Sequence, residues 1–205
     1  EIIAPNYNNI ESVHNYGHYI VHKQNENLIS EWCDLSQGVL MNTFTCQQCN
    51  YTTYNFEPFT VLPLDICDNS NIVSMVRDFL QPLTSQGGWM CDKCQANTQY
   101  VKKIKLWKLP KVMVIVIKRF NDNLSKNNKQ IDVNEILKIK SNSRCIQYNF
   151  SSMALHYGNL QNGHYVSICK NKEDFVLYDD LSIKKVNQHC LCKNAQVYLA
   201  FYNME

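Results

Sequence analysis

The sequence has neither an excess of charge of one sign nor a long apolar run. Its 20 basic and 18 acidic residues are spread along the chain and leave a net charge of +2, whereas a surface that binds nucleic acid or an anionic membrane carries concentrated positive charge. The longest strongly apolar run, Val112 to Ile117, is far shorter than the ~20 residues that a membrane-spanning helix needs. No charged and then apolar leader opens the chain. We therefore expect a soluble protein with no nucleic acid and no membrane among its partners.

The cysteine content, ten in 205 residues, has two interpretations. One is a secreted disulfide scaffold, but this chain is long enough to bury a core without such staples. The other is a metal-binding protein of a reducing compartment, because four of the cysteines form two Cys-x-x-Cys pairs. We expect one domain with a sub-domain, located inside the cell in the cytoplasm or the nucleus.

Local sequence patterns divide the chain into exposed stretches, one helix and a series of strands. Asparagine-rich stretches at residues 6–9 and 121–128 lack apolar periodicity and are predicted to be exposed. Asn71 can cap a helix that runs through Leu80 and stops before Pro82. Residues 109–118 are apolar and β-branched on both faces, which predicts a strand in the middle of a sheet. The alternating segments that follow predict a predominantly antiparallel sheet: Tyr148 to Leu155, Tyr165 to Cys169, Phe175 to Tyr178 and Gln196 to Tyr202.

Two Cys-x-x-Cys pairs, Cys46 with Cys49 and Cys91 with Cys94, have the spacing of zinc knuckles. Each pair presents two thiolates on one tight turn, and the two turns together supply the tetrahedral sulfur set that Zn²⁺ accepts. Two disulfides, or four unrelated core thiols, are the alternative. Because a set of four thiolates has no open ligand position, we expect the site to be structural. The other six cysteines are predicted to fill small apolar spaces: Cys33, Cys67, Cys145, Cys169, Cys190 and Cys192.

A histidine and two aspartates follow the pattern of a catalytic base and its orienting group. His164 lies between a glycine-bearing turn and a predicted strand, and Asp179 and Asp180 end the next apolar segment. Two adjacent antiparallel strands of that length would bring the imidazole and a carboxylate side by side, as in a catalytic triad. A surface histidine with two solvated aspartates is the alternative interpretation.

The tripeptide Gly-His-Tyr occurs twice, at residues 163–165 and at residues 17–19. An ungapped alignment of the two copies places Asp34 opposite Asp180. The earlier copy lies in a polar segment without flanking strand alternation, and Asp34 leads directly into the first knuckle. We therefore interpret the repeat as chance similarity and prefer His164 to His18 as the functional histidine.

Taken in order, these segments resemble the ubiquitin-specific protease family of ubiquitin carboxyl-terminal hydrolases, over roughly residues 28–203. Residues 1–27 have no clear match. The matching blocks are Leu28 to Leu40 as the strand that enters the fingers, the first knuckle, Asn55 to Phe59, the helix from Asn71, the second knuckle, Lys108 to Phe120 with its Lys-Arg-Phe end, Tyr148 to Tyr165 with the histidine box, Tyr178 to Asp180 and Tyr198 to Tyr202.

The resemblance implies a fold class and a domain organisation. The fold would be α+β and cysteine-protease-like, with zinc-ribbon fingers at about residues 40–104, an antiparallel palm sheet at about residues 105–205, and a thumb that is largely missing. The zinc-bound fingers would grip the body of ubiquitin, so that ubiquitin and ubiquitinated proteins are the expected partners.

The resemblance also implies roles for individual residues in a thiol-dependent hydrolysis of (iso)peptide bonds at the C-terminal glycine of ubiquitin. His164 would be the general base and acid, Asp179 would orient it, and Asp180 would assist. The residues that would border the channel for the ubiquitin tail are Tyr165, Gly158 and Gly163.

One part of the family pattern is absent from these residues. The cysteine box, an Asn-Thr-Cys segment that opens a helix, does not occur, and Cys33 precedes a zinc knuckle instead. We therefore expect a fragment of a longer cysteine-type deubiquitinase, in which the nucleophile lies upstream of this chain. A catalytically inactive ubiquitin-binding module and a zinc-stabilised scaffold are the alternatives.

Overall fold

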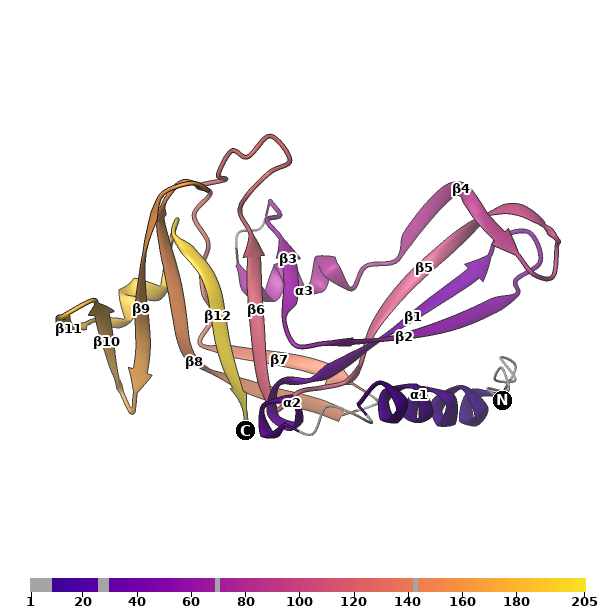
Figure 1. The fold of residues 1–205 in the computed structure, drawn as a ribbon, viewed down its shortest axis with the longest axis horizontal. Helices are drawn as coiled ribbons and strands as arrows, with labels where there is room; N and C mark the ends of the chain where they lie inside the picture. Colours follow the sequence, from indigo (N-terminus) through magenta and orange to yellow (C-terminus); the bar gives the residue numbers. More distant parts are fainter. Residues whose placement is uncertain (1–8, 26–29, 69–70, 142–143) are drawn as a thin grey trace. The chain divides into compact units, whose positions relative to one another are not determined.

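The computed structural model describes residues 9–25, 30–68, 71–141 and 144–205. These residues form two compact units, one within residues 1–59 and 80–109 and the other within residues 60–79 and 110–205 (Figure 1). Both units combine helices with mainly antiparallel sheets, which confirms the predicted α+β class. None of the described helices is long and apolar enough to span a membrane.

The first unit is built on a four-stranded antiparallel sheet with the strand order β2-β1-β5-β4. Strand β1 pairs with β5 from Val39 opposite Lys108 to Cys46 opposite Tyr100. This register brings the turn that follows β1 and the turn that precedes β5 to the same end of the sheet. The strands are β1 (Gly38–Cys46), β2 (Thr52–Phe59), β4 (Leu83–Cys91) and β5 (Ala96–Lys108).

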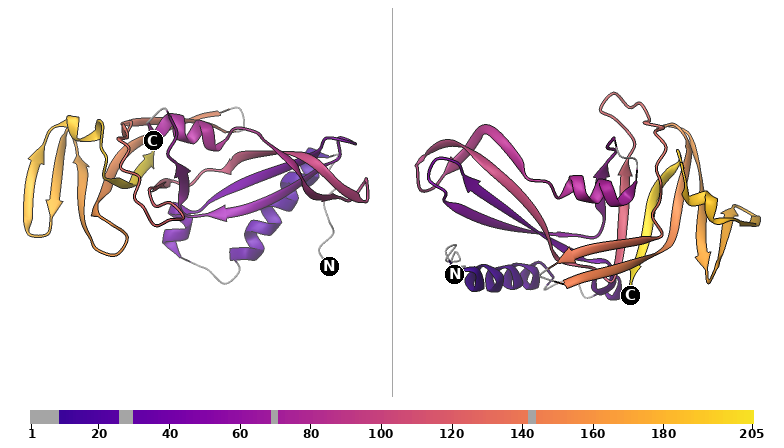
Figure 2. Two further views of the ribbon diagram at one scale, coloured as in Figure 1. Left: turned by 90° about the horizontal axis from the view of Figure 1, so that it is seen from above. Right: turned by 180° about the vertical axis from the view of Figure 1, so that it is seen from behind.

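Helix α1 (Ile10–Asn25) was not expected, because its residues look polar in sequence (Figure 2). The Asn9 side chain caps it by accepting the backbone N–H groups of Glu11 and Ser12 at 2.9 and 3.3 Å. One stripe of the helix packs on the sheet through Val13, which joins a core cluster with Val39, Met41, Phe56 and Trp107. The rest of this asparagine-rich stretch, residues 6–8, was also predicted to be exposed and lies outside the described residues.

Gly17 and two histidines explain why this amphipathic pattern is hard to see in the sequence. A Cβ atom at Gly17 would lie 2.5 Å from the Phe56 ring, so helix and sheet approach each other closely at a residue with no side chain. His14 and His18 cover Trp107, with ring centroids 5.9 and 4.7 Å away. The stripe contains aliphatic residues, since Ile20 and Val21 pack against the same cluster as Val13, but Gly17 and the histidines interrupt it.

The strand expected from Leu28 to Leu40 is shorter than the resemblance implies. Residues 28 and 29 lie outside the described residues, and Glu31–Ser36 form the short helix α2. Glu31 and Asp34 place negative charge in its first turn, which favours a helix, and strand β1 begins only at Gly38.

The second unit contains a larger sheet with the strand order β11-β10-β9-β8-β12-β6-β3, and β7 pairs with β8. Every pairing is antiparallel except that of β3 with β6, which confirms the prediction of a predominantly antiparallel sheet. The strands are β3 (Leu62–Asp65), β6 (Val112–Lys118), β7 (Ile136–Ser141), β8 (Arg144–Gly158), β9 (Gly163–Asn171), β10 (Asp174–Asp179), β11 (Ser182–Val186) and β12 (Val197–Met204), with the 3-10 helix η1 (Gln188–Leu191) before β12.

Strand β6 is flanked on both sides, as its apolar sequence predicts, although it lies next to the edge strand β3 and not at the centre. Residues 60–79, which carry β3 and helix α3 (Ile72–Phe79), fall in this unit because β3 pairs with β6. Asn71 caps α3 by accepting the Ser74 N–H at 2.9 Å, as predicted. The helix ends at Phe79, one residue before the predicted end.

Arg119, at the end of β6, is fully buried and holds two separate segments in place. Its guanidinium donates to the carbonyl oxygens of Asn127 at 2.8 Å and Lys129 at 3.0 Å in one segment. In the other segment it donates to Asn194 at 3.3 Å and Val197 at 2.6 Å. Burial lowers the pKa of Arg119 to about 10. The buried cation is satisfied by carbonyl dipoles and fixes the start of β12.

Candidate active site and metal centre

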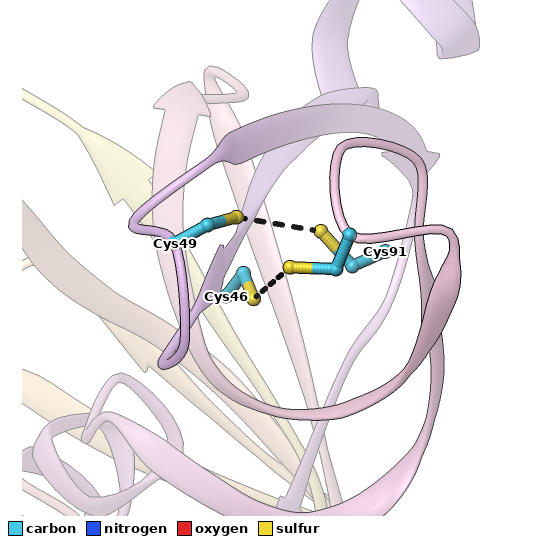
Figure 3. A group of neighbouring side chains, drawn as sticks. Cys46, Cys49 and Cys91 are labelled. Atoms are coloured by element: carbon cyan, nitrogen blue, oxygen red, sulfur yellow. Dashed lines mark hydrogen bonds between the residues drawn. The ribbon is translucent and has the colours of Figure 1, made fainter.

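The four knuckle cysteines converge at one end of the first unit's sheet (Figure 3). Cys46 Sγ lies 3.9 Å from Cys94 Sγ, and Cys49 Sγ lies 3.6 Å from Cys91 Sγ. All four sulfur atoms lie within 4.8 Å of one another, and none of them is in a disulfide. The structure thus brings together, from two hairpins, the set that the spacing predicts.

The two cysteine turns have the same local shape. The residues that follow the pairs, Asn50 and Gln95, have positive φ values of 58° and 54°. Their backbone N–H groups donate to the carbonyl oxygens of Cys46 at 3.0 Å and Cys91 at 2.8 Å. Each turn therefore directs two sulfur atoms toward the same point.

The donor set fits a Zn²⁺ ion. Four sulfur atoms placed ~2.3 Å from a central ion form a tetrahedron with edges of about 3.8 Å, and the measured separations of 3.6 and 3.9 Å are close to this value. A hydrogen bond with Thr98 lowers the pKa of Cys46 to about 6, whereas hydrogen bonding to the neighbouring thiols, above all Cys49, raises the pKa of Cys94 to about 12. Four crowded thiols oppose full ionisation, and a divalent cation would remove this opposition.

The second unit holds the predicted histidine and aspartate side by side. His164 lies near the start of β9 and Asp179 ends β10, and the two strands form a hairpin. His164 Nε2 lies 2.6 Å from Asp179 Oδ1, and the two side chains are 48% and 45% exposed. The pairing of strands and not the linear sequence creates this contact.

The electrostatics of the pair favour the charged imidazole. The hydrogen bond to Asp179 and the charges of Asp179 and Asp180 raise the pKa of His164, against a smaller opposing effect of partial burial. Because Nε2 faces the carboxylate, neutral His164 keeps its proton on Nε2 and leaves Nδ1 free to accept another. Asp180 begins the turn between β10 and β11 with a φ value of 48°.

The turn that precedes His164 requires both of its predicted glycines. Gly158 has a φ value of 105°, and a Cβ atom there would lie 2.4 Å from the carbonyl oxygen of Asn162. A Cβ atom on Gly163 would lie 2.0 Å from His156 Nε2. The Asn159 side chain closes the turn by accepting the Gln161 and Asn162 N–H groups at 2.9 and 2.8 Å. Tyr165, the third residue assigned to the channel, is 55% exposed beside this turn.

His156 and Lys126 were given no role from the sequence alone. His156 is only 4% exposed, and its ring lies 4.7 Å from that of Tyr165 and 5.7 Å from that of Phe120. Lys126 Nζ donates to Gln196 Oε1 at 2.8 Å and to the backbone oxygen of His156 at 2.5 Å. Burial and the nearby Lys126 charge lower the pKa of His156. Sequence reasoning missed both residues, because His156 directly follows the predicted strand Tyr148 to Leu155 and Lys126 lies in a segment predicted to be exposed.

The competing Gly-His-Tyr copy has a different environment. His18 lies on helix α1 with its ring against Trp107, and Asp34 lies on α2. The strand setting that favours His164 is therefore missing around His18.

Fold and site together define a class of α+β protein with two features. The sheet of the second unit carries a histidine paired with an aspartate, and the sheet of the first unit carries four convergent cysteines. Residues 8–202 match the family described as Ubiquitin carboxyl-terminal hydrolase, and the chain belongs to this family. The family predicted from the sequence motifs is thereby confirmed.

Individual relatives are similar over most of the chain. Ubiquitin carboxyl-terminal hydrolase 4 of Arabidopsis thaliana is 31% identical in an alignment 179 residues long, which covers 82% of this chain and 48% of the relative. Ubiquitin carboxyl-terminal hydrolase 4 of Saccharomyces cerevisiae is 26% identical in an alignment 202 residues long, which covers 83% of this chain and 22% of the relative. The chain thus spans half or less of these relatives.

Solved structures share the fold. A chain of the SAGA Ubp8/Sgf11/Sus1/Sgf73 DUB module bound to ubiquitin aldehyde superposes with a TM-score of 0.77 at 24% identity, covering 96% of this chain and 47% of that one. A chain of the yeast SAGA DUB module with a mutant Sgf73 gives a TM-score of 0.80 at 23% identity, with 96% and 48% covered.

Proposed function

We propose that this chain supplies the histidine and aspartate of a cysteine-type deubiquitinase that hydrolyses (iso)peptide bonds at the C-terminal glycine of ubiquitin. The observation that carries the proposal is the 2.6 Å contact between His164 Nε2 and Asp179 Oδ1 in a chain that belongs to the ubiquitin carboxyl-terminal hydrolase family. An oriented imidazole serves proton transfer, and a module that only binds ubiquitin has no use for one.

The chemistry follows from the free nitrogen of His164. Nδ1 takes the proton of a cysteine thiol, and the thiolate attacks the carbonyl carbon of the terminal glycine. The imidazolium that forms, stabilised by Asp179, gives its proton to the departing amine. Water then attacks the thioester while Nδ1 acts again as the base, which releases the carboxylate and restores the thiol.

The thiol in this reaction is proposed to lie in a segment upstream of residue 1. Cys33 is the third residue of the six-residue helix α2 and so does not start a helix as the family's nucleophile box does. We assign it no catalytic role.

The turn before His164 suits an extended peptide without side chains. Gly158 and Gly163 are exposed to solvent, and exposed Tyr165 stands next to them. We assign these three residues to the border of a channel that accepts the glycine-rich end of ubiquitin. The similar DUB module that is bound to ubiquitin aldehyde supports this choice of substrate.

The four cysteines are assigned to one structural Zn²⁺ ion. Its binding would hold the two hairpins of the first unit together, in fingers that contact the body of ubiquitin. We further assign the protein to the cytoplasm or nucleus, with ubiquitinated proteins as substrates and neither nucleic acid nor membrane as a partner.

The proposal is tested by comparing the 205-residue chain with the longer protein encoded by the same gene, using ubiquitin with a fluorogenic group on its C-terminus. We expect no cleavage by the chain alone and thiol-dependent cleavage by the longer protein. Cleavage by the isolated chain that a thiol blocker abolishes would contradict the upstream nucleophile and reopen the case for Cys33.

Ubiquitin binding without cleavage by the longer protein would support the alternative of an inactive binding module. Neither binding nor cleavage would support a zinc-stabilised scaffold.

A further inference from the structure

The His164–Asp179 pair has a second carboxylate beside it. One ring nitrogen of His164 and one carboxylate oxygen each of Asp179 and Asp180 lie within 4.8 Å of one another. Asp180 starts a turn whose next residue, Leu181, is completely exposed, so the cluster is open to solvent. One carboxylate orients the imidazole, and Asp180, which the resemblance gives an assisting role, can in addition bind an ion.

The three donors form a set that transition metals accept. An imidazole nitrogen with two carboxylate oxygens suits Zn²⁺ and similar divalent ions, whereas Mg²⁺ and Ca²⁺ prefer oxygen alone. Ligand atoms ~2.0–2.2 Å from a tetrahedral ion are about 3.4 Å apart. His164 Nε2 and Asp179 Oδ1, now 2.6 Å apart, would have to separate by less than 1 Å, which half-exposed side chains can do by rotation.

We propose that His164, Asp179 and Asp180 form a second metal site, which binds Zn²⁺ or a similar transition ion more weakly than the four cysteines do and thereby switches off proton transfer by His164. An ion at Nε2 occupies the lone pair of that nitrogen, so the single proton of the neutral imidazole moves to Nδ1. Protonated Nδ1 has no lone pair left for the proton of a thiol. Metal binding and the action of His164 as a base therefore exclude each other.

The difference in affinity follows from the ligands. The cysteine set supplies four thiolates and closes the coordination shell, whereas the second set supplies three donors and leaves at least one position to water. The second site should consequently fill only after the first and release its ion readily on dilution or chelation.

The metal site can be tested on the 205-residue chain without any measurement of activity. Protein that already holds one equivalent of Zn²⁺ is titrated with more Zn²⁺ by calorimetry, and the imidazole nitrogen signals of His164 are followed by NMR. We expect a second equivalent to bind and the ring to change from the Nε2-protonated to the Nδ1-protonated tautomer. His164→Ala and Asp180→Asn should each weaken the second equivalent at least ~10-fold.

His18→Ala is the matched control, because His14, His18 and His22 share one side of helix α1 and could bind zinc themselves. This variant should leave the second equivalent unchanged. The metal site is overturned if no second equivalent binds, if it persists in His164→Ala, or if His18→Ala removes it.

The inhibitory part of the proposal rests on the proposed function and needs the longer protein. Zn²⁺ should inhibit cleavage, and Asp180→Asn should raise the concentration for half-inhibition at least ~10-fold. A zinc-inhibited enzyme whose Asp180→Asn variant is equally sensitive would overturn the switch, because the ion would then act elsewhere, such as on the nucleophilic thiol. If the unmodified longer protein does not cleave ubiquitin even without added zinc, the proposed function is contradicted, and the binding result on the 205-residue chain still stands.

Discussion

The catalytic role proposed for His164 depends on which of its two ring nitrogens faces Asp179. Nε2 is 2.6 Å from the carboxylate, so Nδ1 is the nitrogen that points toward a reacting thiol in the proposed mechanism. The sequence contains a second Gly-His-Tyr copy at His18, and the two histidines can be tested against each other in the longer protein.

His164→Ala should reduce the rate of ubiquitin cleavage by at least ~10²-fold, because one imidazole serves as both base and acid. His18→Ala should change the rate little, since His18 packs on Trp107. Asp179→Ala should fall between the two, because a misoriented imidazole keeps part of its function. Steady-state kinetics with folding checked by circular dichroism measures all three. An inactive His18→Ala enzyme beside a normal His164→Ala enzyme would show that the assignment is wrong.

The pKa of His164 gives a prediction that needs no activity. Asp179 and Asp180 raise it above its ordinary value of 6.5, so the Asp179→Asn variant should titrate at a lower pH than the unmodified chain in an NMR titration. A raised pKa in the folded state means that protonated His164 stabilises the fold. This stabilisation is complete below the unfolded-state pKa and disappears as the pH rises through the folded-state pKa. Identical titration curves for the two proteins would contradict the electrostatic role of Asp179.

At the scale of elements, the turn between β8 and β9 sets the position of His164. Gly158 and Gly163 flank this turn, but the structure requires them for different reasons. Gly158 has a left-handed φ value and a Cβ atom would strike backbone, whereas a Cβ atom on Gly163 would strike only the side chain of His156.

This difference predicts the outcome of a double-mutant cycle. Gly163→Ala should destabilise the chain by about 1–3 kcal/mol through overpacking, and the loss should shrink when His156 is also changed to alanine. Gly158→Ala should cost about 1–3 kcal/mol with or without His156, because its strain lies in the backbone. Urea denaturation of the six proteins gives the free energies of unfolding. Equal losses from Gly163→Ala in both backgrounds would mean that the His156 ring is not what excludes a side chain there.

At the scale of the whole molecule, the four knuckle cysteines all belong to one of the two units. Cys46→Ser and Cys91→Ser should each lose the tightly bound zinc measured by elemental analysis, whereas Cys145→Ser, which changes an exposed cysteine, should retain one equivalent. Because metal binding and local folding are coupled, a chelator should speed hydrogen exchange in β1, β2, β4 and β5. Strands β8, β9 and β12 should keep their protection. Full zinc content in both knuckle variants would show that the metal assignment is wrong.

Much of the fold was predictable where the signal is local. The cap of α3 at Asn71, the strand alternation of the second half and the shape of each cysteine turn depend on residues a few positions apart. Helix α1 was missed because Gly17 and the histidines interrupt the aliphatic positions of its buried stripe, which are Val13, Ile20 and Val21. Lys126 was placed among exposed residues because its partner Gln196 lies 70 positions away.

The sequence by itself determined which residues are candidates for the proposed chemistry: two cysteine pairs of knuckle spacing, a histidine after a glycine turn, and an aspartate at the end of the next strand. Only the tertiary structure decided that these residues meet. The pairing of β1 with β5 brings Cys46 within 3.9 Å of Cys94, 48 positions away, and the β9–β10 hairpin brings His164 Nε2 within 2.6 Å of Asp179. The physical reason is that turn shape follows from neighbouring residues, whereas strand register follows from the packing of side chains that are distant in the chain.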